Sequence, residues 1–350
     1  MNQNETLFEL YAEDGLPWAL IALTAVRTFI STIGIICNLA LVYVTIKTNS
    51  LNGPCNILIA FDAAACAWFE IGSWIGMFQI LVGQQFVPIR LCCVYLLLPF
   101  ITGVYASMSA TLLIAFDRLL SICFPIWYAM RKPSRLYSFF LVLLSSLLFP
   151  GFIVQAILRL VLNIPEQKSV MCAPHECIWD WASNQNYALN TLITGTTVAT
   201  YIGIWIILLY RNQNAQNTNN SSDAWTRRIL KALAFLVALQ LAGHTLSSIG
   251  RLTIPQLQLS VTSKAVSTFL LSCLTNIVLA VNGPVLYKMN MEYRKAFQKV
   301  FKFLQPTNYA TSIGTQQQQW AIRVATSMFG IEFLRIISNF QNLQFENCSL

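Results

Sequence analysis

Long apolar stretches alternate with short polar ones along most of the chain. A helix needs about 20 predominantly apolar residues to cross a bilayer, and each stretch is long enough. They lie at roughly 18–46, 55–82, 91–124, 136–162, 186–210, 228–253 and 262–287. The pattern therefore predicts an all-α membrane protein built as a seven-transmembrane helix bundle.

The composition excludes most other classes of protein. Hydrophobic residues make up 56% of the 350 residues and charged residues only 10%, with a mean hydropathy of +0.57. Soluble domains carry about 25% charged residues, so this chain lacks the charge to cover a soluble surface of its size. Collagen-like, coiled-coil and disordered chains need a period, a charge density or a polar bias that is absent here.

The charge distribution predicts the orientation in the membrane. The net charge is +8, which in a soluble protein suggests nucleic acid, but here Lys and Arg gather in alternate loops and after residue 287. Residues 1–17 hold no Lys or Arg and contain the glycosylation motif at Asn4, which functions only on the lumenal side. We therefore expect a plasma-membrane protein with its N-terminus outside and its C-terminus in the cytoplasm. The alternative is an inverted topology with the N-terminus inside, which this distribution of basic residues opposes.

The segment after the last apolar stretch changes character. Residues 289–304 alternate Lys and Arg with Phe and Val at helical spacing, which is typical of an amphipathic helix on a membrane surface. The sequence thus divides into an extracellular N-terminus (1–17), a transmembrane domain (18–288), an amphipathic eighth helix (289–304) and a cytoplasmic tail (305–350). Within that tail, the part after Gln316 is interpreted as a second surface helix or as a disordered segment.

Cysteines near the predicted outer helix ends are candidates for disulfides. Only Cys92, Cys93, Cys172 and Cys177 lie where an oxidising compartment could pair them. Free thiols are the alternative. Cys172, His175 and Cys177 match no usual zinc spacing, so no metal is expected, and no cofactor motif is present.

Four polar residues inside apolar stretches are candidates for function, because polar groups are unfavourable in a bilayer. They are Asn38, Asp62, Asn276 and Asn282. If they lie at matching depth, they form a polar seam that could hold water or a cation between helices. The alternative is that they simply hold helices together by hydrogen bonds.

Several motifs resemble those of rhodopsin-like G-protein-coupled receptors. The segment Asp117-Arg118-Leu119 with Pro125 downstream resembles the family's Asp-Arg-Tyr region. Gly34-x-x-x-Asn38, Leu58-x-x-x-Asp62 and Pro284-x-x-Tyr287 resemble motifs of helices one, two and seven. Tyr293 falls where an aromatic residue opens the family's eighth helix. The resemblance covers roughly residues 20–304, and within the superfamily it is strongest to the nematode serpentine chemoreceptors of class SX.

The resemblance implies a function at the cytoplasmic face. Asp117, Arg118, Pro125 and Tyr287 would take part in coupling to a heterotrimeric G protein, with Arg118 paired to Asp117 at rest. An extracellular ligand, a small molecule or a peptide, would bind in the outer half of the bundle. The chain departs from the family pattern where Gly283 precedes Pro284 and Asn282 is displaced by one residue, which turns a helical side chain by about 100°.

The resemblance also implies a disulfide from Cys93 to the loop at 163–185. Cys172 is the favoured partner because its Cys-x-Pro context is like that of the class SX loop, and Cys177 is the alternative. A second bridge between Cys92 and Cys177 is then possible.

Candidate ligand contacts are Arg27 and Glu70, in the outer halves of predicted helices, and Tyr105 and His244, which could line a pocket. Arg27 and Glu70 would pair with each other or with a polar ligand, since an unpaired charge there is unfavourable. Aromatic residues near helix ends are more often part of an interfacial belt than of a pocket.

Other functions fit the sequence less well. No phosphate-binding loop, His-Glu-x-x-His motif or nucleophile elbow is present, so we do not expect an enzyme. A multi-helix transporter or channel subunit is the remaining alternative, because polar residues at mid-membrane fit some carriers. No internal repeat between the two halves supports it.

Overall fold

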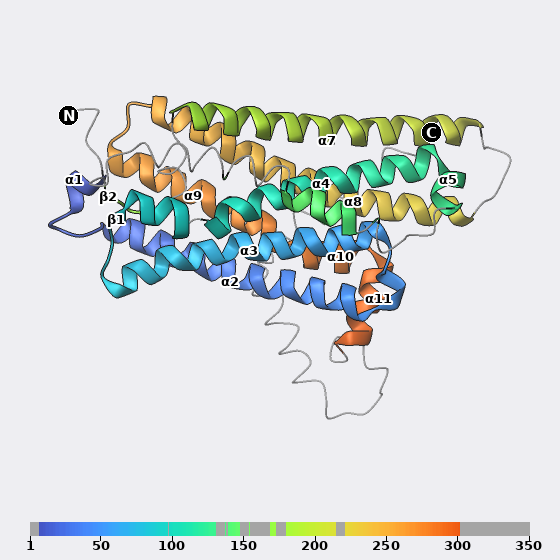
Figure 1. Ribbon diagram of the computed structural model, residues 1–350, viewed down its shortest axis with the longest axis horizontal. Coiled ribbons are helices and arrows are strands. Elements are labelled where there is room, and N and C mark those ends of the chain that lie inside the picture. Colours follow the sequence, from blue (N-terminus) through green and yellow to red (C-terminus); the bar gives the residue numbers. More distant parts are fainter. Residues whose placement is uncertain are drawn as a thin grey trace, which may run out of the picture. The chain divides into compact units, whose positions relative to one another are not determined.

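A computed structural model describes residues 7–96, 98–130, 137, 139–147, 154, 169–172, 180–214 and 221–301 (Figure 1). The chain divides into two compact units, Met1–Phe303 and Leu304–Leu350. The second unit lies outside the described residues, so the expectations for the tail at 305–350 stay predictions.

Long helices coincide with the predicted apolar stretches. They are α2 (Trp18–Lys47), α3 (Pro54–Val82), α4 (Leu98–Cys123), α7 (Asp180–Asn214), α8 (Ser221–Thr253) and α9 (Val261–Ala280). The predicted stretch at 136–162 lies largely outside the described residues. Shorter elements are α1 (Leu7–Tyr11), η1 (Asn49–Leu51), α5 (Pro125–Met130) and η4 (Ile254–Gln256).

Five described segments are long and apolar enough to cross a membrane: Trp18–Lys47, Pro54–Val82, Leu91–Cys123, Ala188–Tyr210 and Val261–Met289. The chain is therefore a helical, multi-pass membrane protein. The described residues confirm this part of the expected fold, whereas the full number of seven spans is not established by them.

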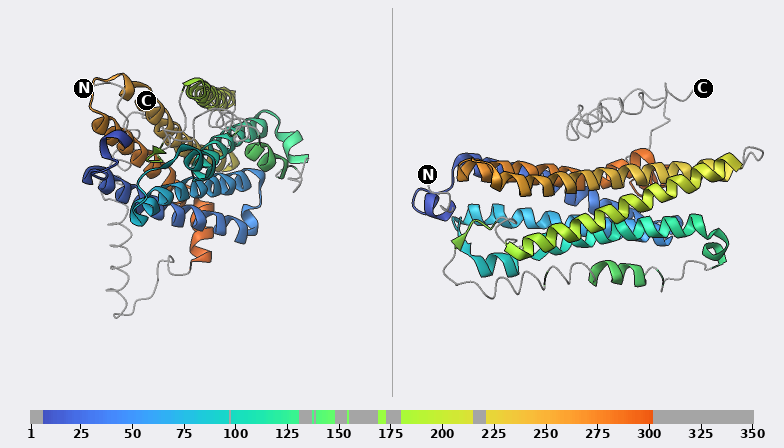
Figure 2. Two further views of the ribbon diagram at one scale, coloured as in Figure 1. Left: turned by 60° about the vertical axis from the view of Figure 1, so that its left-hand side comes forward. Right: turned by 90° about the horizontal axis from the view of Figure 1, so that it is seen from above.

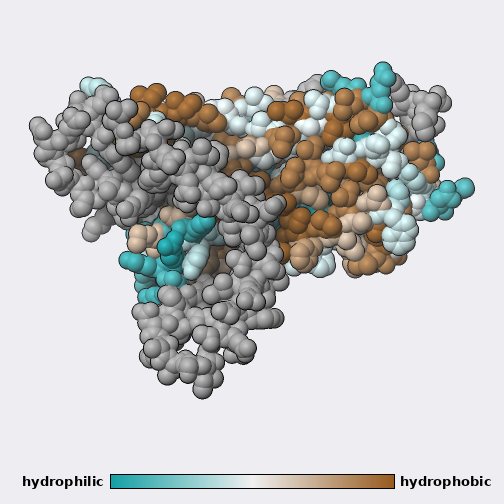
Figure 3. All heavy atoms as spheres, turned by 180° about the vertical axis from the view of Figure 1, so that it is seen from behind, coloured by the Kyte–Doolittle hydropathy of each residue, from teal (hydrophilic) through white to brown (hydrophobic). Residues whose placement is uncertain are grey.

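Large apolar side chains point outward from these helices. On α2, Phe29 and Ile36 are each 63% exposed and Ile46 is 72% exposed. Soluble monomers rarely expose large contiguous apolar surface, whereas lipid-facing helices require it. Figure 3 shows hydrophobic residues along the sides of the helices, with the most hydrophilic described residues toward the ends.

Glycines bring α3 and α4 into very close contact. Helix α2 packs against α3 and α9, and α3 also packs against α4 (Figures 1 and 2). A Cβ added at Gly103 of α4 would lie 2.6 Å from the backbone N of Phe69 and 2.8 Å from the carbonyl O of Ala65. A Cβ at Gly72 of α3 would lie 2.8 Å from the Cβ of Phe100. The α3–α4 contact is therefore backbone against backbone, with no space for a methyl group.

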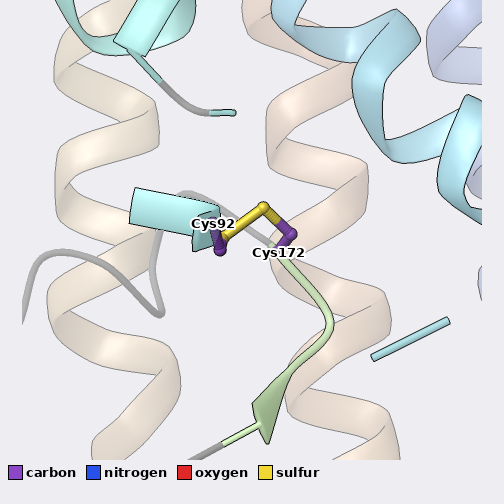
Figure 4. Close-up of a disulfide and its surroundings, with 2 residues drawn as sticks. All are labelled: Cys92 and Cys172. Atoms are coloured by element: carbon purple, nitrogen blue, oxygen red, sulfur yellow. A yellow bond between two sulfur atoms is a disulfide. The ribbon is translucent and has the colours of Figure 1, made fainter. Parts of the chain in front are cut away.

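One end of the bundle carries a small sheet and a disulfide. Strands β1 (Val87–Pro88) and β2 (Ser169–Val170) pair antiparallel, with Val87 opposite Val170. The π-helical turn η2 (Leu91–Leu96) follows β1, and its Cys92 is bonded to Cys172 with a Cα–Cα distance of 5.3 Å (Figure 4). We call this the disulfide end of the bundle.

The predicted bond between Cys93 and Cys172 is wrong, because Cys172 is bonded to Cys92. Neighbouring side chains in a helical turn point about 100° apart, so only one of the two cysteines can face Cys172. The sequence does not indicate which one. The bond also excludes the bridge between Cys92 and Cys177. Cys93 takes part in a disulfide as well, and Cys177, its alternative partner, lies outside the described residues.

The opposite end is formed by α10 (Asn282–Met289) and α11 (Met291–Val300), and we call it the α11 end. Helix α9 ends at Ala280, and α10 begins after the single residue Val281. A Cβ at Gly283 would lie 2.9 Å from the carbonyl O of Cys37 on α2, so a larger residue there would push the two helices apart. This close contact explains why residue 283 is a glycine, whereas the receptors that the motifs resemble have Asn before the proline.

Helix α11 lies within the segment 289–304, for which an amphipathic eighth helix on the membrane surface stays a prediction. The Asn290 side chain caps its start by accepting hydrogen bonds from the backbone N–H groups of Glu292 at 2.9 Å and Tyr293 at 3.4 Å. Tyr293, Ala296 and Phe297 are buried, at i, i+3 and i+4 of one helical face.

Candidate ligand pocket and coupling site

Asp62 lies about two turns into α3, is 2% exposed, and is the centre of a hydrogen-bonded cluster. Its Oδ1 accepts a bond from the Ser107 hydroxyl of α4 at 2.5 Å, and its Oδ2 accepts one from Nε2 of Gln240 on α8 at 3.0 Å. The same Nε2 donates to Oδ1 of Asn282 on α10 at 3.2 Å. Oε1 of Gln240 accepts from Thr111 of α4 at 3.1 Å. We call these five residues the Asp62 cluster, which joins four helices.

The predicted seam is divided into two groups. Asp62 and Asn282 are linked through Gln240, as described. Asn38 and Asn276 belong to a second group between α2, α3 and α9. Among the described residues, no hydrogen bond joins the two groups. Asn282, which is displaced by one residue from the family pattern, is buried, and its side chain bonds to Gln240 and Cys66. At its shifted position it therefore links α10 to α8 and α3.

Asn38 and Asn276 bond across helices. Nδ2 of Asn38 donates to Oε2 of Glu70 at 3.3 Å and to the carbonyl O of Leu279 at 3.1 Å. Nδ2 of Asn276 donates to the hydroxyls of Ser31 at 2.8 Å and Ser73 at 3.2 Å. Both side chains thus hold helices together, and a role in binding water or a cation stays a prediction.

Arg27 and Glu70 are both buried, at 5% and 0% exposure, but they do not pair with each other. Nε of Arg27 donates to Ser73 at 3.2 Å, and its guanidinium lies 5.7 Å from the ring centre of Phe269. The Glu70 carboxyl instead lies against Gly34, where an added Cβ would collide with it. Arg27 and Gly34 are two helical turns apart, about 10 Å. The predicted ion pair is therefore wrong because the two side chains lie at different depths.

A cavity of ≈ 60 Å³ lies between α3, α4, α7, α8 and α9. Its lining residues are Phe69, Phe100, Ile101, Val104, Tyr105, Met108, Asn190, His244, Ser247, Ser248, Arg251, Ser272 and Thr275. Phe69, Phe100, Ile101 and Tyr105 also belong to the buried cluster that contains Cys92 and Cys172, so the cavity lies toward the disulfide end.

Two of the four predicted pocket residues line this cavity. Tyr105 and His244 do, whereas Arg27 and Glu70 are not among the described lining residues. Glu70 faces Gly34, and its neighbour Phe69 faces the cavity instead, because adjacent helical residues point in different directions. Glu70 thus faces α2 rather than the cavity, so the structure does not place it in the predicted pocket.

Asp117 and Arg118 form an ion pair near the end of α4, with 3.3 Å between NH2 of Arg118 and Oδ2 of Asp117. The Tyr128 hydroxyl of α5 donates to both carboxylate oxygens at 3.1 and 3.2 Å. Burial, followed by the nearby Asp117 charge, raises the pKa of Tyr128 and keeps its hydroxyl a donor. Pro125 is the first residue of α5, where its missing N–H has no helical partner to lose.

Tyr287 connects α10 to α11. Its ring lies 5.8 Å from that of Phe297 at an angle of 81°, and its carbonyl O accepts from Nε of Arg294 at 3.2 Å. Tyr293 of α11 is completely buried, and burial raises its pKa. The predicted coupling residues thus lie at α5, α10 and the end of α4.

Asn4 and Cys177 lie outside the described residues, so glycosylation at Asn4 stays a prediction. Within the described parts of the chain, no group of three His, Cys, Asp or Glu side chains gathers in a way that could hold a metal ion.

Sequence reasoning missed several residues that the structure brings into the site. Gln240 joins the Asp62 cluster, and Arg251 and Asn190 line the cavity. Gln240 is an amide within the apolar stretch 228–253, which was an available signal. Arg251 lies near a helix end, where an Arg is ordinarily explained by the bilayer interface.

Comparison with known proteins identifies the family. The family described as serpentine type 7TM GPCR chemoreceptor Srsx matches residues 31–301, which include the Asp62 cluster, the cavity and the Asp117–Arg118 pair. A search of the curated proteins found no match. The family favours a chemosensory receptor over a transporter or channel, and it confirms the resemblance inferred from the motifs. The chain belongs to the Srsx family of serpentine seven-transmembrane chemoreceptors.

Proposed function

We propose that this chain is a chemosensory receptor of the plasma membrane that binds a small extracellular molecule and activates a heterotrimeric G protein. Its N-terminus would be extracellular, and α11 would lie on the cytoplasmic side. The ligand would occupy the cavity toward the disulfide end. The observation that carries the proposal is the Asp117–Arg118 pair with Tyr128 at the opposite end of the bundle, within a chain of this family.

The Asp62 cluster supports communication between the two ends. The cavity is lined by α8, and Gln240 of α8 bonds to Asp62 and Asn282. A ligand shifts a two-state equilibrium only when it binds one arrangement more tightly. A ligand that favours a moved α8 would change these bonds and thereby the position of α10, which packs against α11. Arg118 would then leave Asp117 and face the G protein.

The proposal can be tested without knowing the ligand. Asp117→Asn removes the charge that holds Arg118, whose side chain is 23% exposed. A partly exposed ion pair contributes about 1 kcal/mol, so basal signalling should rise about fivefold in a G-protein reporter assay. Arg118→Ala should abolish that signal, alone and combined with Asp117→Asn, at equal surface expression.

A control variant separates coupling from a general loss of positive charge. Lys264 lies at the start of α9, toward the disulfide end, and Lys264→Gln should leave basal signalling unchanged. If the Arg118→Ala receptor signals like the unmodified one, the assignment of Arg118 to G-protein coupling is refuted.

A further inference from the structure

The apolar side of α11 is turned toward the bundle. Tyr293, Ala296 and Phe297 are buried, and α11 packs against α10 and α2 (Figure 1). The Phe297 ring lies 6.0 Å from that of Phe301, which in turn lies 6.4 Å from that of Tyr43 on α2. A helix that binds a membrane by insertion needs its apolar face for the acyl chains. In α11 that face already contacts protein, so these side chains cannot also insert into lipid.

The outward side of α11 is basic. Arg294, Lys295 and Lys299 are exposed. Lys295 and Lys299 are four residues apart, so they lie on the same side of the helix, where like charges repel each other. Nε of Arg294 donates to the carbonyl O of Tyr287 at 3.2 Å, and its Nη2 donates to the carbonyl O of Lys288. Because Lys288 is itself exposed, the positive charge of α11 continues onto the end of α10.

The same charge extends to the end of α2. Lys47 is the last residue of α2, is exposed, and follows Tyr43 by about one helical turn. We call five exposed cations the basic surface: Lys47, Lys288, Arg294, Lys295 and Lys299. None of them forms an ion pair with an acidic side chain in the described part of the chain. The acidic residue of α11 is Glu292 alone, so the surface carries a net positive charge.

The basic surface begins where the lipid-facing part of α2 ends. Leu39, Tyr43 and Ile46 are 52%, 53% and 72% exposed, and Lys47 follows directly. Apolar side chains so exposed require the hydrocarbon of a bilayer around them, whereas a Tyr or Lys at the end of a span lies at the level of the lipid headgroups. Since Phe301 contacts Tyr43, the C-terminal end of α11 lies at that level as well.

We propose that the basic surface binds the headgroups of acidic phospholipids, so that charge, and not inserted side chains, holds α11 at the membrane. Ammonium and guanidinium groups donate charge-assisted hydrogen bonds to phosphate. Basic residues just beyond a span attract acidic lipids, with a gain in affinity of about fivefold for each Lys or Arg. Phosphatidylcholine has no net charge and gains nothing comparable. The proposal is independent of the proposed receptor function, because lipid binding requires neither an extracellular ligand nor a G protein.

Lipid binding by the purified full chain tests the proposal. Native mass spectrometry in a neutral detergent follows the binding of added phosphatidylserine or phosphatidylcholine. Phosphatidylserine should bind more tightly than phosphatidylcholine. The double variant Lys295→Gln/Lys299→Gln should weaken the apparent affinity for phosphatidylserine by about thirtyfold, which is about fivefold for each lysine, and should leave phosphatidylcholine binding unchanged.

Two control variants identify the source of the effect. Lys295→Arg/Lys299→Arg keeps both charges and should bind phosphatidylserine as the unmodified chain does. Lys264→Gln removes a cation at the start of α9, toward the disulfide end, and should also leave that affinity unchanged. Circular dichroism of each variant checks that it is folded.

Three outcomes would overturn the proposal. The first is equal binding of the two lipids by the unmodified chain, and the second is undiminished phosphatidylserine binding by the folded double Gln variant. The third is displacement of phosphatidylserine by an equal concentration of glycerophosphoserine, its soluble headgroup, which would identify a site for soluble phosphates in place of a membrane lipid.

Discussion

Replacing Gln240 with leucine should weaken the middle of the bundle. Gln240 is 2% exposed and makes three side-chain hydrogen bonds, to Asp62, Asn282 and Thr111. Leucine has nearly the same size but can make none of them. The variant therefore tests whether the hydrogen bonds of the Asp62 cluster, rather than the packing of Gln240, stabilise the fold.

The three hydrogen bonds of Gln240 contribute unequally to the free energy of unfolding. The hydrogen bond to the Asp62 carboxylate contributes about 1.5–3 kcal/mol, because one partner carries charge. Neutral side-chain bonds in membrane proteins contribute about 0.6 kcal/mol each. The Thr111 hydroxyl also donates to the Ser107 carbonyl O at 3.0 Å, so it keeps a hydrogen-bond partner when Gln240 is replaced. Because lipid and detergent chains are as apolar as leucine, burial of the new side chain contributes little, and Gln240→Leu should lower the free energy of unfolding by about 2–3.5 kcal/mol.

The assay is unfolding of the purified receptor by increasing SDS in mixed micelles, followed by circular dichroism. Gln79→Leu is the matched control. Gln79 lies on α3, is 7% exposed, and its Nε2 has no hydrogen-bond partner in the described part of the chain. The control should therefore be neutral or slightly stabilising, since leucine removes a buried donor without a partner.

The two variants together decide the question. If Gln240→Leu lowers the free energy of unfolding no more than Gln79→Leu does, the hydrogen bonds of the Asp62 cluster do not stabilise the bundle. A second check uses Asp62→Asn as background, where Gln240→Leu should cost less because the charged partner is gone.

Three further predictions concern other parts of the fold. Gly103→Ala should destabilise the receptor by about 1–3 kcal/mol in thermal unfolding, because its Cβ would overlap the backbone of α3, whereas Gly195→Ala, with nothing within 4 Å, should be neutral or stabilising. Cys172→Ser should cost about 2–4 kcal/mol, whereas Cys93→Ser should leave the Cys92–Cys172 crosslink detectable by non-reducing mass spectrometry. The pKa of Tyr128 is higher in the folded chain than in the unfolded one, so its stabilising effect should be complete below about pH 10 and disappear as the pH rises through the folded-state pKa. Tyr128→Phe should flatten that decline in pH-dependent unfolding, and an identical decline in both proteins would contradict the assignment.

The sequence predicted the features that depend on composition and order. Apolar length located the helices, since the hydrocarbon core sets the length of a span. The Asp117–Arg118 contact followed from a motif of adjacent residues, whose side chains can meet without knowledge of the rest of the fold.

Features that depend on helical rotation and depth could not be predicted in the same way. Cys92 and Cys93 are neighbours, and only the rotation of η2 decides which one meets Cys172. Arg27 and Glu70 were both predicted to lie in outer halves of helices, but the pairing register of α2 and α3 places their side chains at different levels. A single sequence contains no direct measure of either quantity.

The glycine contacts divide the bundle into parts that can and cannot slide. Helices α3 and α4 touch through backbone atoms at Gly72 and Gly103, and any shift between them would drive main-chain atoms together. Helix α8 is held to its neighbours at Gln240 by amide hydrogen bonds, which can be exchanged for new partners within one step of a helix. A shift of α8 at Gln240 therefore costs the exchange of hydrogen bonds, whereas a shift between α3 and α4 costs an overlap of backbone atoms, so the contact of α8 is the easier of the two to rearrange.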